Sequence, residues 1–220
     1  MRARRQSAGV EIHLGRQVVA VLGDTKVTGV RLDDGSEIAC DAVLVAIGVV
    51  PRTELATAAG LAVDNGIAVD GHLRTSDPAI SAAGDCCSFP HPLYAGRRVR
   101  LEAWRNAQDQ GNHVAARLTG GSEPFHAVPW FWSDQYDLGL QITGLPDTAT
   151  TTVVRTRADG TEIHFGLGPD GLLLAATGVA PGTGIARDIR IAELLIARQA
   201  APDPAVLADP AVSLKSLLRS

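Results

Sequence analysis

The chain has 220 residues, of which 45% are hydrophobic and 20% charged, so it is long enough to bury one or two cores. Its formal net charge of −4 provides no overall basic field, which argues against nucleic acid as the main partner. No apolar run reaches the roughly 18 residues that span a bilayer, and the start MRARRQSAGV lacks the apolar core of a secretory signal, so we expect a cytoplasmic protein that does not bind membranes.

The first third of the chain predicts short strands joined by tight turns. Strands are expected at 10–15, 17–23 and 28–38, and the last of these contains Asp34-Gly35, a hairpin signal between alternating apolar positions. The run DAVLVAIG at 41–48 is apolar without alternation, which is typical of a strand buried on both faces of a layered α/β sheet.

The next segment continues this layer. Pro51 breaks the chain, and TELATAAG predicts a short helix over 53–60 with Thr53 as its N-cap. A further strand is expected at 66–70, and AISAAGD at 79–85 ends the layer. A helix from Trp104 follows, because small or apolar residues recur on one helical face until Gly120-Gly121.

The last part of the chain has a different character and predicts a second domain. The segment 151–179 alternates around Asp159-Gly160 and Asp170-Gly171, which indicates three antiparallel strands linked by two hairpin turns. An apolar-faced helix follows in ARDIRIAELLIARQA. We place the boundary near Glu123, which gives an α/β layered-sheet part over 1–123 and a small α+β domain with a three-stranded antiparallel sheet over 124–220.

A Gly-Asp pair, Gly84-Asp85, closes a run of small and apolar residues. At the carboxyl edge of an α/β sheet, a glycine lets the chain approach a ligand, and a carboxylate accepts hydrogen bonds from polyol hydroxyls. The alternative is an ordinary turn in which the aspartate caps local backbone amides.

Two motifs together favour the ligand-binding alternative. VLVAIGVVPRTEL at 43–55 and LRTSDPAISAAGDC at 73–86 resemble the paired signatures of the pyridine-nucleotide flavoprotein reductases. The resemblance implies that Asp85, beside Gly84, binds the ribityl chain of FAD, and that Gly48 and Pro51 shape the nucleotide side.

Two downstream segments narrow the resemblance. RRVRLEAWRNAQDQGNHVAARL at 97–118 and PWFWSDQYDLGLQITG at 129–144 are similar to the oxygenase-coupled ferredoxin reductases. The resemblance implies that Trp104 lies beside the isoalloxazine ring, where the amino-terminal end of its helix would favour the negative charge of reduced flavin. Trp132 is expected either as a second wall near the ring or in domain packing, and Glu102 either at the nicotinamide side or in an ion pair with Arg100 or Arg105.

The family resemblance implies electron transfer from NAD(P)H through FAD to a ferredoxin of 2Fe-2S type that serves an oxygenase, and it leaves a homodimer open. Such a reductase carries two strand–GxGxxG–helix segments, neither of which occurs in this sequence. The chain therefore resembles the carboxyl-terminal portion of a reductase, and we expect it to be inactive alone. The alternative is a non-catalytic truncated remnant that acts as an interaction or dimerisation module.

The arginines and the cysteines are two further groups of candidate functional residues. The basic run Arg97, Arg98, Arg100 and Arg105 is either a solvated face or a surface that steers an acidic ferredoxin into place. Cys40, Cys86 and Cys87 form no CxxC and cannot all pair, so neither a disulfide framework nor a thiol relay is expected.

Overall fold

The structure is a computed structural model that describes residues 1–219. The chain divides into two compact units, Met1–Val50 and Pro51–Ser220. The predicted boundary near Glu123 lies within the second unit and stays a prediction. In the described residues, no helix is both long and apolar enough to cross a membrane.

The first unit contains one short helix and one small sheet. Helix α1 spans Arg2–Ser7, and an antiparallel sheet of order β1-β2-β3 is formed by Val18–Leu22, Gly29–Leu32 and Glu37–Ala39. The predicted hairpin turn is confirmed. Gly35 takes a φ of 84°, and the Asp34 carboxylate accepts bonds from the amide and hydroxyl of Ser36 at 3.0 and 2.6 Å.

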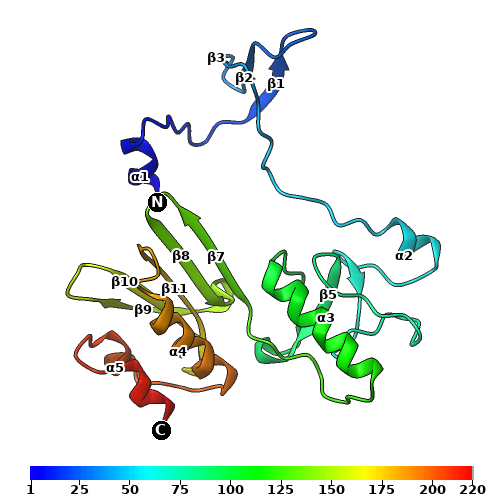
Figure 1. Ribbon diagram of the computed structural model, residues 1–220, viewed down its shortest axis with the longest axis vertical. Coiled ribbons are helices and arrows are strands. Elements are labelled where there is room, and N and C mark those ends of the chain that lie inside the picture. Colours follow the sequence, from blue (N-terminus) through cyan, green and yellow to red (C-terminus); the bar gives the residue numbers. More distant parts are fainter. Residues whose placement is uncertain (220) are drawn as a thin grey trace. The chain divides into compact units, whose positions relative to one another are not determined.

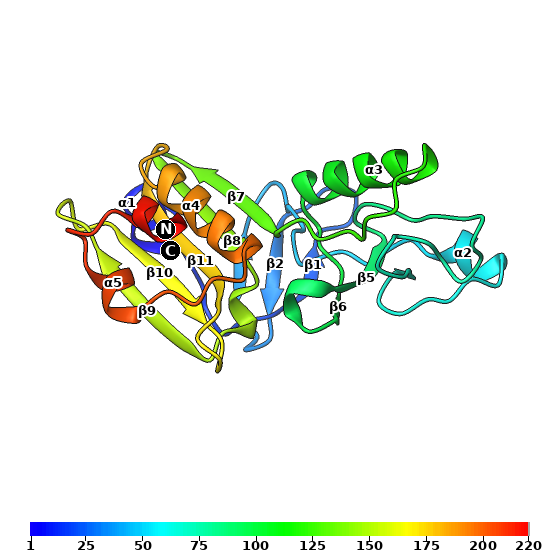
Figure 2. The same ribbon diagram turned by 90° about the horizontal axis from the view of Figure 1, so that it is seen from below.

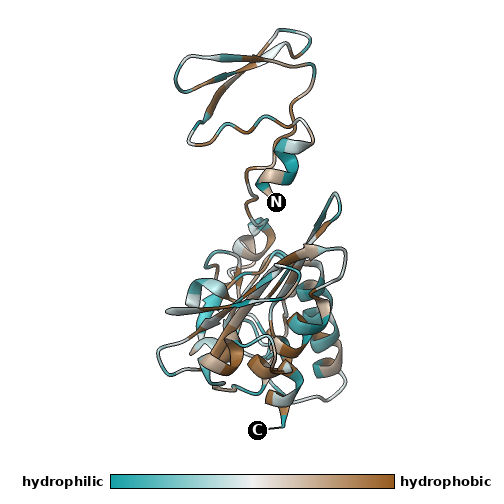
Figure 3. Cartoon of the chain, turned by 90° about the vertical axis from the view of Figure 1, so that its left-hand side faces the viewer, coloured by the Kyte–Doolittle hydropathy of each residue, from teal (hydrophilic) through white to brown (hydrophobic). Residues whose placement is uncertain are grey.

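Two strands predicted in this unit are not formed. Residues 10–15 and 41–48 belong to no strand, and in the second segment Leu44 and Ile47 are 93% and 91% exposed. A strand of this composition is stable only when neighbours satisfy its backbone and cover its faces, and no described strand pairs with it. Figure 3 shows both hydrophobic and hydrophilic stretches along this unit.

The second unit begins with helix α2, Glu54–Ala58, and a small sheet of order β4-β5-β6. The predicted helix is confirmed, although Thr53 makes no side-chain capping bond. The strands of the small sheet, β4 to β6, are Ile67–Ala68, Cys87–His91 and Arg97–Val99. Strand β4 runs parallel to β5, and β6 runs antiparallel to it. The segment 79–85 forms only an isolated bridge between Ser81 and Arg74, so it is a loop and not the predicted end strand.

Strand β5 was not predicted because Pro90 lies within it. Proline donates no ladder hydrogen bond and is tolerated only where no partner needs one. The partner strand β4 ends opposite Ser88, so Pro90 lies beyond the pairing on that side. Phe89 of this strand is fully buried and packs edge-to-face on Phe125 at 5.4 Å between ring centroids.

The predicted long helix is confirmed as α3, Trp104–Leu118. It ends before Gly120 and Gly121, and the Gly121 amide donates to the carbonyl of Ala116 at 2.9 Å. Two polar residues on this helix, Asn106 and Gln110, are buried.

A five-stranded antiparallel sheet of order β7-β8-β11-β10-β9 forms the rest of the second unit (Figure 1). In chain order, strands β7 to β11 are Trp130–Gln135, Leu138–Gly144, Thr151–Thr156, Glu162–Leu167 and Leu173–Pro181. The three predicted strands are β9, β10 and β11, and all three are confirmed. The sheet is larger than predicted because a hairpin of β7 and β8 adds two strands to its edge.

The predicted last helix is confirmed as α4, Ala186–Ala197, and it covers one face of this sheet (Figure 2). Ile163 and Phe165 of the sheet and Ile189 and Leu195 of the helix are buried in the core between them. Helix α5, Pro204–Ala208, and the following segment are held by the buried Arg155, which donates to the carbonyls of Leu207 and Val212.

One turn of this sheet matches the GxGxxG spacing by chance. Gly166, Gly168 and Gly171 lie at the β10–β11 hairpin, where the Gly168 amide donates to the Leu172 carbonyl at 2.9 Å. No helix follows this turn, so it is not the phosphate-binding turn of a dinucleotide fold.

Candidate functional site

The Gly84-Asp85 turn is fixed on helix α3. Gly84 takes a φ of 84°, and its amide donates to Oε1 of the fully buried Gln110 at 2.7 Å. A methyl group at Gly84 would lie 3.6 Å from the Cβ of Ala107 on the same helix. The turn is therefore held at a set position beside the first half of α3.

The Asp85 side chain is exposed and has no hydrogen-bond or ion-pair partner among residues 1–219. It does not cap local backbone amides, which was the alternative to ligand binding. Its main-chain carbonyl accepts a bond from Arg100 at 3.1 Å, so the backbone of the turn is anchored while the carboxylate is left open. An anchored backbone with a free carboxylate suits binding of hydroxyl groups.

Helix α3 begins without a side-chain cap. Its N-cap residue is Ala103, which has no side-chain acceptor, so the amides of the first turn from Trp104 onward are left for another partner. The segment that enters the helix is held by Asn106, whose Nδ2 donates to the Leu101 carbonyl at 3.1 Å. This uncapped end carries the positive end of the helix dipole and favours a negatively charged group.

The structure brings the predicted aromatic residues together. Trp104 is the first residue of α3, and its ring meets Trp132 of β7 edge-to-face at a centroid distance of 6.4 Å and an angle of 88°. Trp132 in turn stacks on Trp130 at 5.1 Å and 26°. Trp104 is 67% exposed and Trp132 39% exposed, so part of each indole ring is open to solvent.

Glu102 forms an ion pair with Arg100, which is one of the two expected arrangements. Because Arg100 also binds the Asp85 carbonyl, this guanidinium connects the two acidic positions. Pro51 is half-buried at the start of the second unit, whereas Gly48, with a φ of 99°, belongs to the first unit. Gly48 therefore belongs to a different unit from the other predicted residues.

The arginines of the basic run are paired, although Arg97 and Arg98 lie at the surface. Arg97 pairs with Asp147 at 2.7 Å, Arg98 donates to the Ser88 carbonyl at 2.6 Å, and Arg105 pairs with Glu193. These contacts within the second unit occupy the guanidinium groups. The structure therefore gives no support to ferredoxin steering by this run.

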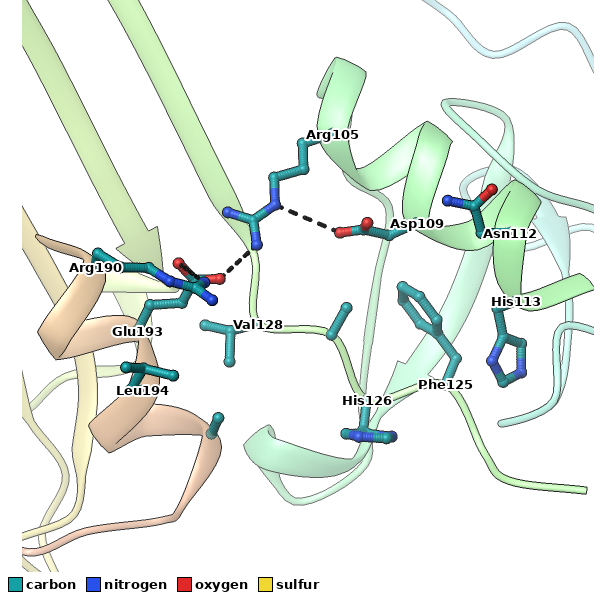
Figure 4. Close-up of a pocket in the computed structure, with 12 residues that line it drawn as sticks. Arg105, Asp109, Asn112, His113, Phe125, His126, Val128, Arg190, Glu193 and Leu194 are labelled. Carbon is teal, nitrogen blue, oxygen red and sulfur yellow. Dashed lines mark hydrogen bonds and ion pairs between the residues drawn. The ribbon is translucent and has the colours of Figure 1, made fainter. Parts of the chain in front are cut away.

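Sequence reasoning missed one polar residue of α3 and did not foresee the partner of another. Gln110, which holds the Gly84 turn, lies on the same helical side as Ala107 and Gly111, and an isolated polar residue among small ones is a weak signal. Arg105 was assigned to the surface run, yet its side chain reaches a buried carboxylate on α4 (Figure 4). That contact joins segments far apart in the sequence, so no local pattern indicates it.

A cavity of about 550 Å³ lies between α3 and α4. It is lined by Arg105, Asp109, His113, Phe125 and Glu193, among others, and contains none of the predicted cofactor-binding residues. Burial raises the pKa of Asp109 here, against the opposing effect of Arg105.

The buried Cys87 thiol, two residues after Asp85, is not suited to chemistry. Burial raises the pKa of Cys87 to about 12, so the thiolate form is scarce at neutral pH. All three cysteines are free thiols.

The fold and the site together define a class of protein. Residues 1–111 match the pyridine nucleotide-disulphide oxidoreductases, and residues 130–218 match the family described as reductase C-terminal. The chain belongs to the pyridine nucleotide-disulphide oxidoreductase family, as its motifs predicted, and proteins of this kind use FAD and NAD(P)H.

Particular relatives are ferredoxin reductases of oxygenase systems. The chain is 50% identical to the ferredoxin–NAD(+) reductase component of the anthranilate 1,2-dioxygenase system of Burkholderia cepacia, over 84% of this chain and 45% of the relative. It is 46% identical to putidaredoxin reductase of Pseudomonas putida, over 68% of this chain and 36% of the relative. The crystal structure of the covalent putidaredoxin reductase–putidaredoxin complex matches with a TM-score of 0.90 and 37% identity, over 99% of this chain and 52% of the solved chain. The chain thus spans about half or less of the length of these proteins.

The residues present fit part of an FAD molecule. The open Asp85 carboxylate suits the hydroxyls of the ribityl chain, and the uncapped start of α3 with the ring of Trp104 suits the isoalloxazine head. A strand–GxGxxG–helix segment for the pyrophosphate is not among the described elements.

Proposed function

We propose that the chain forms the carboxyl-terminal part of an FAD-dependent NAD(P)H:ferredoxin reductase that supplies an oxygenase. The observation that carries this proposal is the open Asp85 carboxylate on a turn anchored to α3. The names of the relatives, which are ferredoxin reductases of dioxygenase and related systems, support the same assignment. The electron acceptor is a ferredoxin of 2Fe-2S type.

The two parts of the chain have separate tasks in this proposal. Residues 1–123 complete the FAD- and NAD(P)-binding region, and residues 124–220 form the interface domain. We infer a cytoplasmic protein, in which the interface domain also offers a surface for a homodimer. The proposed boundary lies between α3 and β7, which places the two indole-bearing elements in different domains.

The predicted residues of the second unit have separate roles in binding FAD. Asp85 accepts hydrogen bonds from ribityl hydroxyls, and Gly84 keeps the backbone close enough for that contact. The amides at the start of α3 favour negative charge at the pyrimidine edge, and Trp104 and Trp132 exclude water from the ring. When bound, FAD supplies the conversion of a two-electron donor, NAD(P)H, into single electrons for the ferredoxin.

Residues on the nucleotide side complete the proposal. Gly48 and Pro51 shape the approach of NAD(P)H, and Glu102, fixed by Arg100, lies on the nicotinamide side. The 220 residues alone are expected to be inactive, because Asp85 and α3 bind only one end of FAD.

The test joins this chain to the part of the Pseudomonas putida putidaredoxin reductase that precedes the matched region, a protein called here the chimera. We expect the chimera to be yellow and to reduce a 2Fe-2S ferredoxin with NADH or NADPH, measured as bleaching of the ferredoxin absorbance. A folded, colourless chimera that reduces neither ferredoxin nor a dye would overturn the proposal and favour the non-catalytic interaction module.

A further inference from the structure

Arg105 lies between a buried carboxylate and an aromatic cluster. It follows Trp104 on the first turn of α3, and its Nη2 donates to Oε1 of Glu193 on α4 at 2.5 Å. Its Cζ lies 5.4 Å from the ring centroid of Trp130 on β7. One guanidinium therefore contacts two other elements, and Figure 4 shows the side chain reaching from α3 toward α4.

The aromatic cluster closes a loop of contacts around this guanidinium. Trp130 stacks on Trp132, and Trp132 meets Trp104 edge-to-face. Trp104 precedes Arg105 in the sequence. The contacts from Arg105 to Trp130, from Trp130 to Trp132 and from Trp132 to Trp104 therefore form a closed ring. A cation placed over Trp130 holds that ring through cation–π attraction, and the stack transmits the constraint to Trp132.

Glu193 does not depend on Arg105 alone for its charge balance. Its side chain is 6% exposed, and a buried carboxylate needs a paired cation. Arg190, on the same helix, lies 2.7 Å from its other oxygen but is 57% exposed. Among the described residues, no contact joins Arg190 to the indoles. Both arginines therefore pair with Glu193, but only Arg105 also contacts a tryptophan ring.

We propose that Arg105 is a positioning residue that fixes Trp132 and Trp104 as the wall of the flavin site, through its contacts with Trp130 and Glu193. This inference rests on the proposed function of the two indoles. Without the guanidinium, β7 and the first turn of α3 lose their common anchor, and the indoles take several orientations. The expected consequence is slower electron transfer with little change in the KM for NADH, because Arg105 itself touches neither substrate in the proposal.

The first test uses the 220-residue chain and needs no cofactor. Coupling between stacked indoles gives a near-ultraviolet circular dichroism signal that depends on their mutual angle. Arg105→Gln should lose most of this signal at unchanged far-ultraviolet signal, whereas the matched control Arg190→Gln, which removes the other partner of Glu193, should keep it. Arg105→Lys retains the charge and should keep an intermediate signal.

The second test uses the chimera. Arg105→Gln should lower kcat for ferredoxin reduction by about tenfold to a hundredfold, as misplacement of a site wall does, and Arg190→Gln should leave it unchanged. Equal effects of the two substitutions on both signals would show that Arg105 only neutralises Glu193, and no effect of Arg105→Gln on the dichroism would also overturn the inference. If the Arg105→Gln protein does not fold, the same comparison is made with Arg105→Lys, whose wild-type signal and kcat would contradict the proposal.

An inactive chimera would separate the two ideas. If the wild-type chimera reduces no ferredoxin, the proposed function fails, while the dichroism of the 220-residue chain still decides whether Arg105 orients the indoles.

Discussion

At the scale of single residues, the proposed flavin site depends on Asp85 more than on any other side chain of this chain. Its backbone is anchored by Arg100 and by the Gly84 contact with Gln110, so the carboxylate needs little reordering on binding. Hydrogen bonds from hydroxyls to a charged acceptor are stronger than those between neutral groups.

Asp85→Asn should therefore weaken FAD binding by the chimera. The lost charge-assisted bonds contribute about 1.5–3 kcal/mol, which corresponds to roughly a tenfold to hundredfold rise in Kd. Quenching of flavin fluorescence during titration measures this directly. Glu123→Gln, at an exposed carboxylate beyond the end of α3, is the control and should leave Kd unchanged. An equal Kd for Asp85→Asn and wild type would show that the carboxylate is not a ligand.

A second prediction at this scale concerns His91 and pH. The ring is fully buried between Phe89 and Tyr94, and its Nε2 lies 3.0 Å from the Ala127 carbonyl. Burial lowers the pKa of His91 to about 4, against 6.5 when exposed. Between pH 6.5 and 4, the His91 ring is therefore protonated in the unfolded chain but not in the folded chain. Stability is greatest above pH 6.5 and falls as the pH drops toward 4.

The free energy of unfolding should fall by about 1.4 kcal/mol per pH unit through this group alone. Urea titrations between pH 7 and 4.5 measure the trend. His91→Gln should flatten it relative to wild type, while His164→Gln, at an exposed ring that pairs with Glu162, should not. A wild-type slope in the His91→Gln protein would mean that other groups carry the acid sensitivity.

At the scale of elements, local patterns indicate helices well and the strand pairing only in part. Helices α3 and α4 follow from apolar periodicity, which each segment carries by itself. The β7–β8 hairpin was missed because its turn is Tyr136-Asp137, where Tyr136 takes a φ of 58° without the usual glycine or asparagine. The Asp137 carbonyl of this turn accepts a bond from the Gly182 amide at 2.9 Å, a contact that the local sequence does not indicate.

Strand β8 offers a stability test at Gly144. This residue has a φ of 76°, and a Cβ there would lie 2.0 Å from the Leu174 carbonyl oxygen on the paired strand β11. Gly144→Ala should cost about 4 kcal/mol or more, because both the conformation and the space forbid a side chain. Gly160→Ala is the matched control with a φ of 79° and open space, and should cost about 1 kcal/mol. Similar midpoints in urea for the two variants would contradict the close approach of β8 and β11.

At the scale of the whole molecule, motifs in the sequence indicate the candidate site residues, but not the contacts that these residues make. Asp85 and Trp104 were indicated by motifs that resemble a known family, whereas the Arg105–Glu193 pair joins residues 88 positions apart and leaves no local trace. The expected buried strand at 41–48 failed for a related reason. Its sequence is suited to burial, but the described chain supplies no partner strand.

This segment leads to a prediction about the chimera. In the 220-residue chain Leu44 is 93% exposed, so Leu44→Asp should change the free energy of unfolding by less than about 0.5 kcal/mol. In the chimera, the same substitution should cost about 3 kcal/mol or more if the segment becomes a buried strand. Urea unfolding of the four proteins gives both values, and an equally small effect in both would show that 41–48 is not a core strand of the longer protein.

The most direct measurement is a crystal structure of the FAD-bound chimera, read at Asp85. We expect a carboxylate oxygen within about 3 Å of a ribityl hydroxyl oxygen, with Trp104 beside the ring and the Gly84 amide still donating to Gln110. A bound flavin with the Asp85 carboxylate turned onto its own main chain, and no contact to the ribityl chain, would contradict it.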